Sequence, residues 1–392
     1  MWRECEDLQD YIVGIRRDLH QIPELGLNLP ETQAYICAEL DRLGIDYKKN
    51  EGDSGIIGEI KGGHPGKTVL LRADIDALPI QEDTGLPFSS KHEGKMHACG
   101  HDSHAAMLLG ALRVLAAHRG ELNGNVRFVF QTAEEISKGA QQAIKEGVTE
   151  GVDAVFGLHI GSILGGSLPS GTLSVVPGCC MASFDRFVIN VKGSGCHGST
   201  PEKGIDPVTI AANIVLSLQE IVAREIAGTK PSVLTIGMIN GGFAYNVIPS
   251  EVKIEGTIRA LEEPVRMQLA KRIEEISRNI AAAFRGSVDF LMDWGAPPVI
   301  NDEKMAALAA EAAKKVLGGG DVKTSQDAPN MGGEDFAYYL AEKPGAFMFL
   351  SSADHAKCTD VPHHNPKFMI DEDVLHKGSA VFVSIVEDFL GR

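Results

Sequence analysis

Hydrophobic and polar residues follow two different periods through the first half of the chain. Residues 31–43, ETQAYICAELDRL, carry a helical pattern, and Gly44 comes directly after them. The segments 68–79, 125–135 and 152–160 are instead apolar runs that predict strands. Because strand and helix patterns alternate, the sequence predicts an α/β fold in which helices flank a mixed, mainly parallel sheet.

Ionisable side chains follow each of these predicted strands. They are Asp74 and Asp76, Glu134 and Glu135, and His159. The carboxyl ends of the strands in an open α/β sheet line the crevice in which ligands bind. We therefore expect these side chains to converge on one site.

The pattern changes near residue 183 and changes back after the segment PPVIND. Between these points the order strand, helix, strand, strand, helix, strand predicts a ferredoxin-like α+β unit, with elements at 184–193, 206–225, 232–241, 250–261, 264–284 and 286–294. A helix at 302–317, a strand at 345–352 and a closing helix then resume the first pattern. We expect a first domain made of residues 1–182 and 296–392, interrupted by a second domain at 183–295.

The segment MHACGHDSHAAM, residues 96–107, concentrates three histidines, a cysteine and an aspartate ahead of an apolar helix. Taken alone, such a cysteine would pack as a small apolar residue, and such histidines would only form hydrogen bonds. Cys99 and His101 lie at the expected entrance to the helix, however, and Glu135 and His159 lie at strand ends. Thiolate, imidazole and carboxylate together suit a zinc- or manganese-class ion.

Composition narrows the classes of protein to which the chain can belong. Its 392 residues suffice for two cores, and 44% hydrophobic with 23% charged residues is typical of a soluble globular protein. No apolar run reaches the roughly 18 residues of a membrane span, and residues 1–20 lack a secretory pattern. Seven cysteines, an odd number, fit reduced thiols in the cytoplasm. A formal charge of −16 would repel a phosphate backbone, so we expect neither nucleic acid nor membrane as a partner.

Nine short motifs are spread over essentially the whole chain: RRDLHQIPELG (16–26), RADIDALPI (72–80), MHACGHDSHAAMLLGAL (96–112), FQTAEE (130–135), GLH (157–159), GCHGSTPEKGIDP (195–207), NVIPSEVKIEGTIRAL (246–261), GGEDFAYY (332–339) and HHNPKF (363–368). In this order they resemble the amidohydrolase branch of the aminoacylase and carboxypeptidase-type co-catalytic metallopeptidases. That branch contains hippurate hydrolases, N-acyl-L-amino acid amidohydrolases, N-acetyldiaminopimelate deacetylases and auxin-conjugate hydrolases. The resemblance implies a di-metal exopeptidase-like catalytic domain with an inserted ferredoxin-like lid that serves dimerisation.

The resemblance also implies a centre of two divalent metal ions, manganese or zinc in the first place and nickel or cobalt as alternatives. Its expected ligands are Cys99, His101, Glu135, His159 and His364. The sulfur of Cys99 would be able to bridge the two ions. Asp76 would orient a ligand imidazole. Asp74 stands near the position of a histidine ligand in the broader family, and the resemblance assigns it no role.

Glu134 falls at the family's position for the general base. A second reason comes from strand geometry, because consecutive residues leaving a strand point in different directions. One carboxylate can then bind metal while its neighbour faces the bound water.

The resemblance places further functional residues in the inserted domain and near the end of the chain. His197 would polarise the scissile carbonyl, and Asn246 and Arg259 would bind the substrate carboxylate, in some relatives within the active site of the partner subunit. Gly333, in the motif GGEDFAYY, is expected among the substrate-binding residues. Cys196 stands where the family usually has glycine and adds bulk beside His197.

These features predict an enzyme that hydrolyses small N-acyl-L-amino acids, with acetyl, benzoyl or similar acyl groups, to a free amino acid and a carboxylate. We expect it to be a homodimer formed through the lid domain. A carboxypeptidase or dipeptidase on the same scaffold is one alternative, and a non-catalytic metal- or ligand-binding relative is another. The presence of Glu134 argues against the second, because binding alone needs no base. The sequence does not specify the acyl group, the amino acid or the metal.

Overall fold

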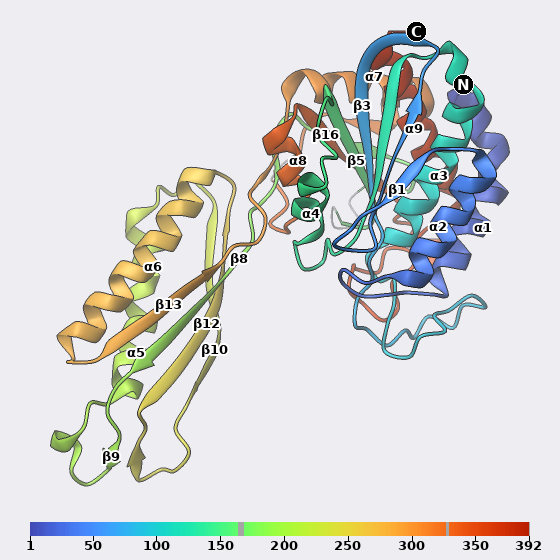
Figure 1. Cartoon of the computed structure of the whole chain (residues 1–392). Helices are drawn as coiled ribbons and strands as arrows, with labels where there is room; N and C mark the ends of the chain where they lie inside the picture. The colour runs from blue at the N-terminus through green and yellow to red at the C-terminus, as the bar shows by residue number, and fades with distance from the viewer. Residues whose placement is uncertain (164–167, 327–328, 392) are drawn as a thin grey trace. The chain divides into compact units, whose positions relative to one another are not determined.

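The computed structural model describes residues 1–163, 168–326 and 329–391, which form two compact units (Figure 1). The first unit comprises Met1–Cys180, Val299–Ala328 and Asp335–Arg392, and the second comprises Met181–Pro298 and Pro329–Glu334. Each unit has a hydrophobic core of its own. The chain of the first unit is therefore interrupted by the second.

An eight-stranded sheet forms the centre of the first unit, with the strand order β1-β2-β4-β3-β5-β16-β6-β15. The strands are β1 Tyr47–Lys49, β2 Ile56–Lys61, β3 His64–Asp74, β4 Asn123–Gln131, β5 Ala154–Gly161, β6 Leu173–Ser174, β15 Val322–Lys323 and β16 Gly345–Ser351. The neighbours β4, β3, β5 and β16 run parallel, whereas β1 with β2, β2 with β4, and β16 with β6 pair antiparallel. The mixed, mainly parallel sheet predicted from the sequence is confirmed.

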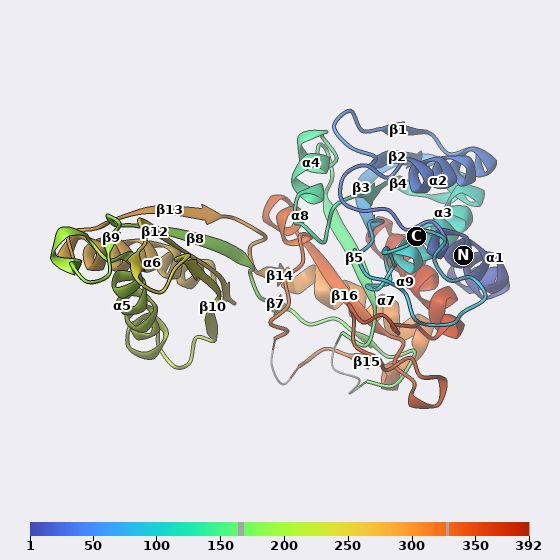
Figure 2. The ribbon, with the colours of Figure 1, turned by 90° about the horizontal axis from the view of Figure 1, so that it is seen from below.

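Helices cover both faces of this sheet (Figure 2). They are α1 Gln9–His20, α2 Pro30–Leu43, α3 His101–Ala117, α4 Gly139–Lys145, α7 Glu303–Leu317, α8 Ala337–Glu342 and α9 Leu375–Leu390. Helices α3 and α9 pack on each other and on β3, whereas α4 and α8 pack on each other at the opposite face. All residues of α3 except Arg113 and Ala117 are buried, which accounts for its nearly continuous apolar sequence.

Short elements complete the first unit. Its 3₁₀ turns are η1 Trp2–Leu8, η2 Arg119–Glu121, η5 Gly319–Asp321, η6 His355–Lys357 and η7 Glu372–Val374. Strands β7 Gly178–Met181 and β14 Val299–Asn301 form a two-stranded ladder. Among the described residues, no helix combines the length and the apolar character that crossing a lipid bilayer requires.

The second unit is a four-stranded antiparallel sheet with two helices on one face (Figure 1). Its elements are β8 Asp185–Lys192, α5 Pro207–Glu220, β10 Ser232–Gly241, β12 Glu251–Ala260, α6 Glu263–Ala283 and β13 Ser287–Asp293. The strand order β10-β12-β8-β13 confirms the ferredoxin-like prediction. The predicted helix at 206–225 ends earlier, because its last turn, η4 Ile221–Glu225, is a π-helix. A small ladder of β9 Cys196–His197 and β11 Val247–Ile248, with the 3₁₀ turn η3 Pro201–Lys203, extends this unit.

Candidate metal centre

The parallel strands β3, β4 and β5 deliver their last residues to the same edge of the sheet. Strand β3 ends at Asp74, β4 ends at Gln131 just before the two glutamates, and β5 contains His159 close to its end. Helix α3 begins at His101, and Gly100 before it has a left-handed backbone with φ of 92°. This turn brings Cys99 and the start of α3 to the same place as the strand ends.

Asp76 is buried, and its hydrogen bonds link the loop that carries Glu134 and Glu135 to the start of α3. Its Oδ1 accepts a hydrogen bond from the backbone N–H of Glu134 at 3.0 Å, and its Oδ2 accepts one from Glu135 at 3.2 Å. The backbone carbonyl of Asp76 accepts a hydrogen bond from Nδ1 of His101 at 2.9 Å. The structure thus places Asp76 in contact with a candidate ligand imidazole and with the backbone of both glutamates.

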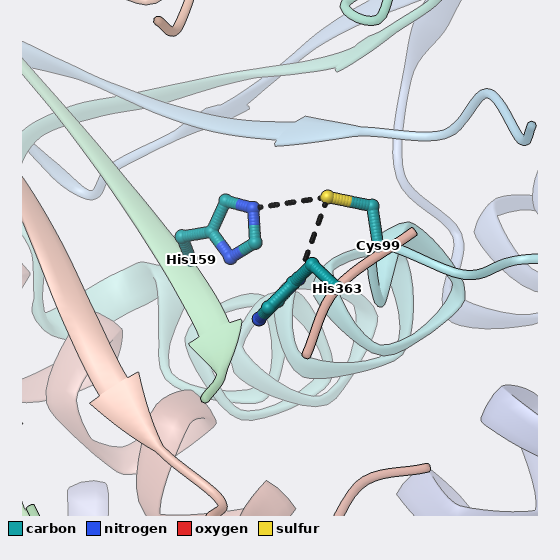
Figure 3. Close-up of side chains that lie close together, drawn as sticks. All are labelled: Cys99, His159 and His363. Carbon is teal, nitrogen blue, oxygen red and sulfur yellow. Dashed lines mark hydrogen bonds between the residues drawn. The ribbon is translucent and has the colours of Figure 1, made fainter. Parts of the chain in front are cut away.

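Side chains capable of metal binding form overlapping groups in which the ligand atoms all lie within 4.8 Å of one another. One group is Cys99, His159 and His363, shown in Figure 3, where the Cys99 sulfur lies 3.5 Å from Nε2 of His159 and 3.6 Å from Nδ1 of His363. Further groups include Cys99 with Glu135 and His364, His101 with Glu134 and Glu135, and Asp74 with His101 and His104. All five ligands expected from the sequence therefore belong to one connected cluster.

The buried atoms of this cluster lack the partners that a purely structural role would give them. Nδ1 of His101 is bonded to Asp76. Its Nε2 lies 3.4 Å from Asp74 and 3.9 Å from Oε1 of Glu135, but neither Nε2 nor this Oε1 has a hydrogen bond among the described residues. Nδ1 of His159 donates to the Ile160 carbonyl at 2.9 Å, so its Nε2 presents a lone pair toward Cys99. Buried polar atoms without partners are costly. The cluster fits divalent metal ions, which would satisfy these lone pairs.

Burial and neighbouring charges set the protonation of the cluster. Burial raises the pKa of the Cys99 thiol well above its usual value, and burial also raises the pKa of Glu135 to about 7. Burial lowers the pKa of His159, so its imidazole is neutral. Burial disfavours the charge of His101, but Asp74, Cys99 and Asp76 together outweigh it, and the pKa of His101 is raised. Metal binding at this cluster must therefore displace protons.

Asp74 is the centre of a buried polar network behind the cluster. Its carboxylate accepts a hydrogen bond from Arg72 at 2.8 Å and another from Nδ1 of His104, and it lies 3.4 Å from Nε2 of His101. The remaining ring nitrogen of His104 accepts a hydrogen bond from the Ile160 N–H at 2.9 Å. Asp74 therefore ties the end of β5 to the start of α3, which is a role that the sequence did not assign.

In the second unit, His197 and Asn246 lie together on the β9–β11 ladder. His197 pairs with Val247 in register, and the Gly198 N–H donates to the Asn246 carbonyl at 2.8 Å. The ring of His197 is exposed, and its Nδ1 accepts from the Ser199 N–H at 3.1 Å. The sulfur of the neighbouring Cys196 lies 3.6 Å from the Thr200 carbonyl oxygen, within its own loop.

Arg259 and Gly333 are brought together by a shared contact with Phe184. The guanidinium of Arg259 lies 5.4 Å from the centre of the Phe184 ring, and burial lowers its pKa. A β-carbon at Gly333 would come within 1.9 Å of the same ring, so only glycine fits there. These two residues form a group separate from the His197–Asn246 ladder within the second unit.

His363 is the member of the cluster that the sequence did not single out. The motif HHNPKF suggested His364, and the structure does place His364 with Cys99 and Glu135. The side chain of His364 is about half exposed, with φ of 62°, whereas His363 packs inward against His159 and Phe368. The adjacent pair of histidines indicated a candidate ligand, but no periodic pattern of residues predicted which of the two side chains points inward.

Comparisons with known proteins agree with this geometry. The N-acetyl-L-cysteine deacetylase of Bacillus subtilis is 41% identical over 374 residues, covering 95% of this chain and 86% of that protein. Thermostable carboxypeptidase 1 of Saccharolobus solfataricus is 36% identical over 393 residues, covering 99% and 98%. The solved YXEP protein of Bacillus subtilis, described as a dinuclear metal-binding peptidase of the M20 family, superposes with a TM-score of 0.83 at 36% identity, covering 98% of this chain and 99% of that one. Residues 70–388 match the model of peptidase family M20/M25/M40, and the chain belongs to that family.

Proposed function

We propose that this protein is a metal-dependent amidohydrolase that cleaves small N-acyl-L-amino acids to a free amino acid and a carboxylate. The observation that carries the proposal is the buried cluster of thiol, imidazole and carboxylate groups with unpartnered ligand atoms, beside a second glutamate. The similarity to an N-acetyl-L-cysteine deacetylase favours an acylated amino acid as the substrate class.

The residues that would hold two divalent ions are Cys99, His101, Glu135, His159 and His364, with Cys99 between the two positions. Its place in two of the ligand groups supports this bridging role. Sulfur, nitrogen and oxygen donors together suit zinc, manganese, cobalt or nickel. When bound, the two ions would acidify a water molecule and polarise the substrate carbonyl.

Glu134 would accept the proton of the attacking water and later donate it to the leaving amine. Its backbone N–H and that of Glu135 are bonded to opposite oxygens of Asp76. This anchoring holds the two neighbouring carboxylates in fixed and different directions. Glu135 can then bind metal while Glu134 remains available to the water.

The second unit would supply the groups that recognise the substrate. We assign His197 to the oxyanion that develops on the carbonyl, and Asn246 and Arg259 to the carboxylate of the amino acid. Because His197 and Asn246 lie apart from Arg259 in the second unit, we propose that they act in the active site of the partner subunit. Partial burial of Arg259 beside Phe184 strengthens its attraction to an anion by limiting solvent screening. Gly333, which has no side chain to clash with Phe184, would contact the substrate through its backbone.

A panel of substrates tests the proposal and separates it from a peptidase. Protein loaded with zinc, manganese or cobalt is incubated with N-acetyl, N-benzoyl and indole-acetyl amino acids, and with dipeptides, and released amine is measured. We expect turnover of acylated amino acids. Turnover of dipeptides alone would replace the proposal with a dipeptidase or carboxypeptidase, which the archaeal carboxypeptidase relative favours. No turnover of either class, with metal bound, would leave a non-catalytic binding protein.

We further propose that the protein forms a homodimer through the free edge of β10. This strand pairs only with β12 among the described strands, and Met238 and Ile239 on it are exposed, as are Phe243 and Tyr245 beyond it. An exposed apolar edge strand is a natural surface for pairing with a second copy. Light scattering should give twice the chain mass, and Ile239→Lys should give a monomer. A wild-type monomer would contradict this proposal.

The cytoplasm is the compartment that we propose for the enzyme. Cys5, Cys37 and Cys99 are buried thiols that form no disulfide, which is typical of proteins in a reducing compartment.

A further inference from the structure

His363 lies inside the cluster although its neighbour His364 is the ligand suggested by the sequence. The ring of His363 packs at 4.6 Å, centre to centre, on Phe368 and at 5.2 Å on His159. Figure 3 shows His363 beside His159 and Cys99. The N–H of His364 donates to the Ala98 carbonyl at 2.9 Å. This hydrogen bond holds the histidine pair against the loop that carries Cys99. The position of the His363 ring is thus fixed by both packing and the backbone.

Gly161, at the end of β5, leaves room for this ring. A β-carbon at residue 161 would lie 2.3 Å from both Cε1 and Nε2 of His363, closer than any real contact. Gly161 also has φ of 133°, a backbone conformation that residues with side chains rarely adopt. The space that His363 occupies therefore depends on glycine at this position.

Two ring nitrogens converge on one sulfur in this arrangement. Nε2 of His159 lies 3.5 Å and Nδ1 of His363 lies 3.6 Å from the sulfur of Cys99. A thiol has a single proton and can donate it to only one of them. Nδ1 of His363 is in hydrogen-bond contact with the sulfur, whereas its Nε2 is buried without a hydrogen-bond partner among the described residues. The thiol can donate to His159 and its sulfur can accept from His363, so hydrogen bonds and a shared metal ion both account for these contacts, and the two differ in whether metal binding depends on His363.

The separations are those of atoms that share one metal ion. Bond lengths of about 2.3 Å to sulfur and about 2.0 Å to nitrogen at a tetrahedral angle place sulfur and nitrogen about 3.5 Å apart. Both measured separations agree with this value. We propose that His363 is an additional ligand of the dinuclear centre, and that its Nδ1 completes the metal position formed by Cys99 and His159.

This inference rests on the metal centre of the proposed function and adds a selectivity to it. The position of Cys99, His159 and His363 offers one sulfur and two nitrogens, whereas that of Cys99, Glu135 and His364 includes a carboxylate. Sulfur and imidazole donors favour zinc, cobalt or nickel, and carboxylate donors suit manganese better. The two positions are therefore expected to differ in metal preference.

Cobalt binding tests the assignment without measuring activity. Metal-free wild type, His363→Leu and His363→Asn are titrated with cobalt(II) against a competing chelator, while the thiolate charge-transfer and d–d absorption bands are recorded. Removing a residue that contacts only a metal ligand, and not the metal itself, already lowers metal affinity by about 10- to 100-fold. We expect His363→Leu to lower cobalt affinity at one position by at least that factor, to change the d–d bands, and to affect manganese much less. The amide oxygen of His363→Asn should restore part of the affinity.

Two further variants control for folding and for surface effects. Gly161→Ala should displace the ring and weaken the same cobalt position, whereas Gly151→Ala, at another glycine with positive φ and no neighbour within 4 Å, should not. His355→Leu removes an exposed histidine and should leave both positions intact. Circular dichroism of the metal-free proteins verifies that each variant is folded.

The inference is wrong if folded His363→Leu binds two cobalt ions with the affinity and spectrum of the wild type. A shift of the charge-transfer band alone, with unchanged affinity and d–d bands, would also overturn it, because His363 would then only form a hydrogen bond with the sulfur. Failure of the proposed function would give a different combination of turnover and cobalt binding. Wild type that turns over no substrate, although His363→Leu loses cobalt, would refute the amidohydrolase and leave the ligand assignment standing.

Discussion

Adjacent residues of identical chemistry are assigned different tasks at this site. Glu134 and Glu135 have their backbone N–H groups bonded to opposite oxygens of one carboxylate, so the loop presents their side chains in different directions. Only Glu135 belongs to the ligand group with Cys99 and His364. This difference in surroundings makes the two positions separable by experiment.

Glu134→Gln should lower turnover by about 10²- to 10⁴-fold, the usual contribution of general-base catalysis, while both metals stay bound. Glu135→Gln should instead lose metal, because a neutral amide replaces an anionic ligand, and excess metal should restore part of its activity. Metal content by mass spectrometry is measured beside turnover for both variants. A fully active Glu134→Gln protein, or one that is inactive only through metal loss, would show that the roles are reversed.

Arg259 leads to a prediction about the substrate. A charge-assisted hydrogen bond to the substrate carboxylate contributes about 1.5–3 kcal/mol, so amidating that carboxylate should lower kcat/KM by about 10- to 100-fold. Arg259→Gln should remove most of this preference for the acid over the amide. Arg278→Gln, which changes an arginine paired with Glu274 on the surface, should keep it. Equal rates on acid and amide with wild type would refute the assignment.

At the scale of elements, the loop after β4 depends on Asp76 for its conformation. In Asp76→Asn one oxygen is replaced by an amide NH₂, which faces a backbone N–H and cannot accept from it. The lost bond and the buried unpaired N–H should cost about 1–3 kcal/mol. We expect a lower melting temperature together with weaker metal binding, because the same loop carries Glu135.

Asp153→Asn is the matched control for Asp76. Asp153 also accepts a backbone N–H, that of Thr68 at 2.8 Å, but near the opposite end of β3. Loss of this hydrogen bond in Asp153→Asn should lower the melting temperature without changing metal affinity, as measured by chelator competition. If both variants bind metal as the wild type does, Asp76 serves only general stability.

Sequence patterns predicted helices and strands well where the burial of an element alone determines which of its residues are apolar. Strand β5 and helix α3 are buried on all sides, and their nearly continuous apolar residues could be recognised. Glu135 and His159 could be identified as candidate site residues because parallel strands have their carboxyl ends at the same edge of the sheet. The π-helical turn after α5 left no mark in the pattern.

The position of His363 could not be predicted in the same way. Its orientation depends on Gly161, on Phe368 and on the hydrogen bond between His364 and Ala98, all of which are tertiary contacts. The buried network of Asp74 with Arg72 and His104 was missed for the same reason. Residues whose role is set by distant neighbours give no local signal.

At the scale of the whole molecule, the metal cluster lies entirely within the first of two units that have separate hydrophobic cores. A ligand that binds only the folded first unit stabilises that unit by mass action. Free metal at 1,000 times its dissociation constant contributes about 4 kcal/mol, which corresponds to a rise of about 10 °C in melting temperature. The core of the second unit gains nothing directly from this binding.

The effect of removing metal should therefore be local and should depend on pH. The pKa of Glu135 is about 7 and that of Cys99 is raised, so both hold protons in the metal-free protein in mildly acidic solution, and binding must displace them. Affinity should rise as pH increases from about 6 to about 8, because fewer protons compete. Calorimetry with and without chelator should show a larger loss of stability at the higher pH, and hydrogen exchange should locate the loss in peptides of β3, β5 and α3 rather than β8 and β12. A loss that is independent of pH, or equal in both units, would contradict metal binding at this cluster.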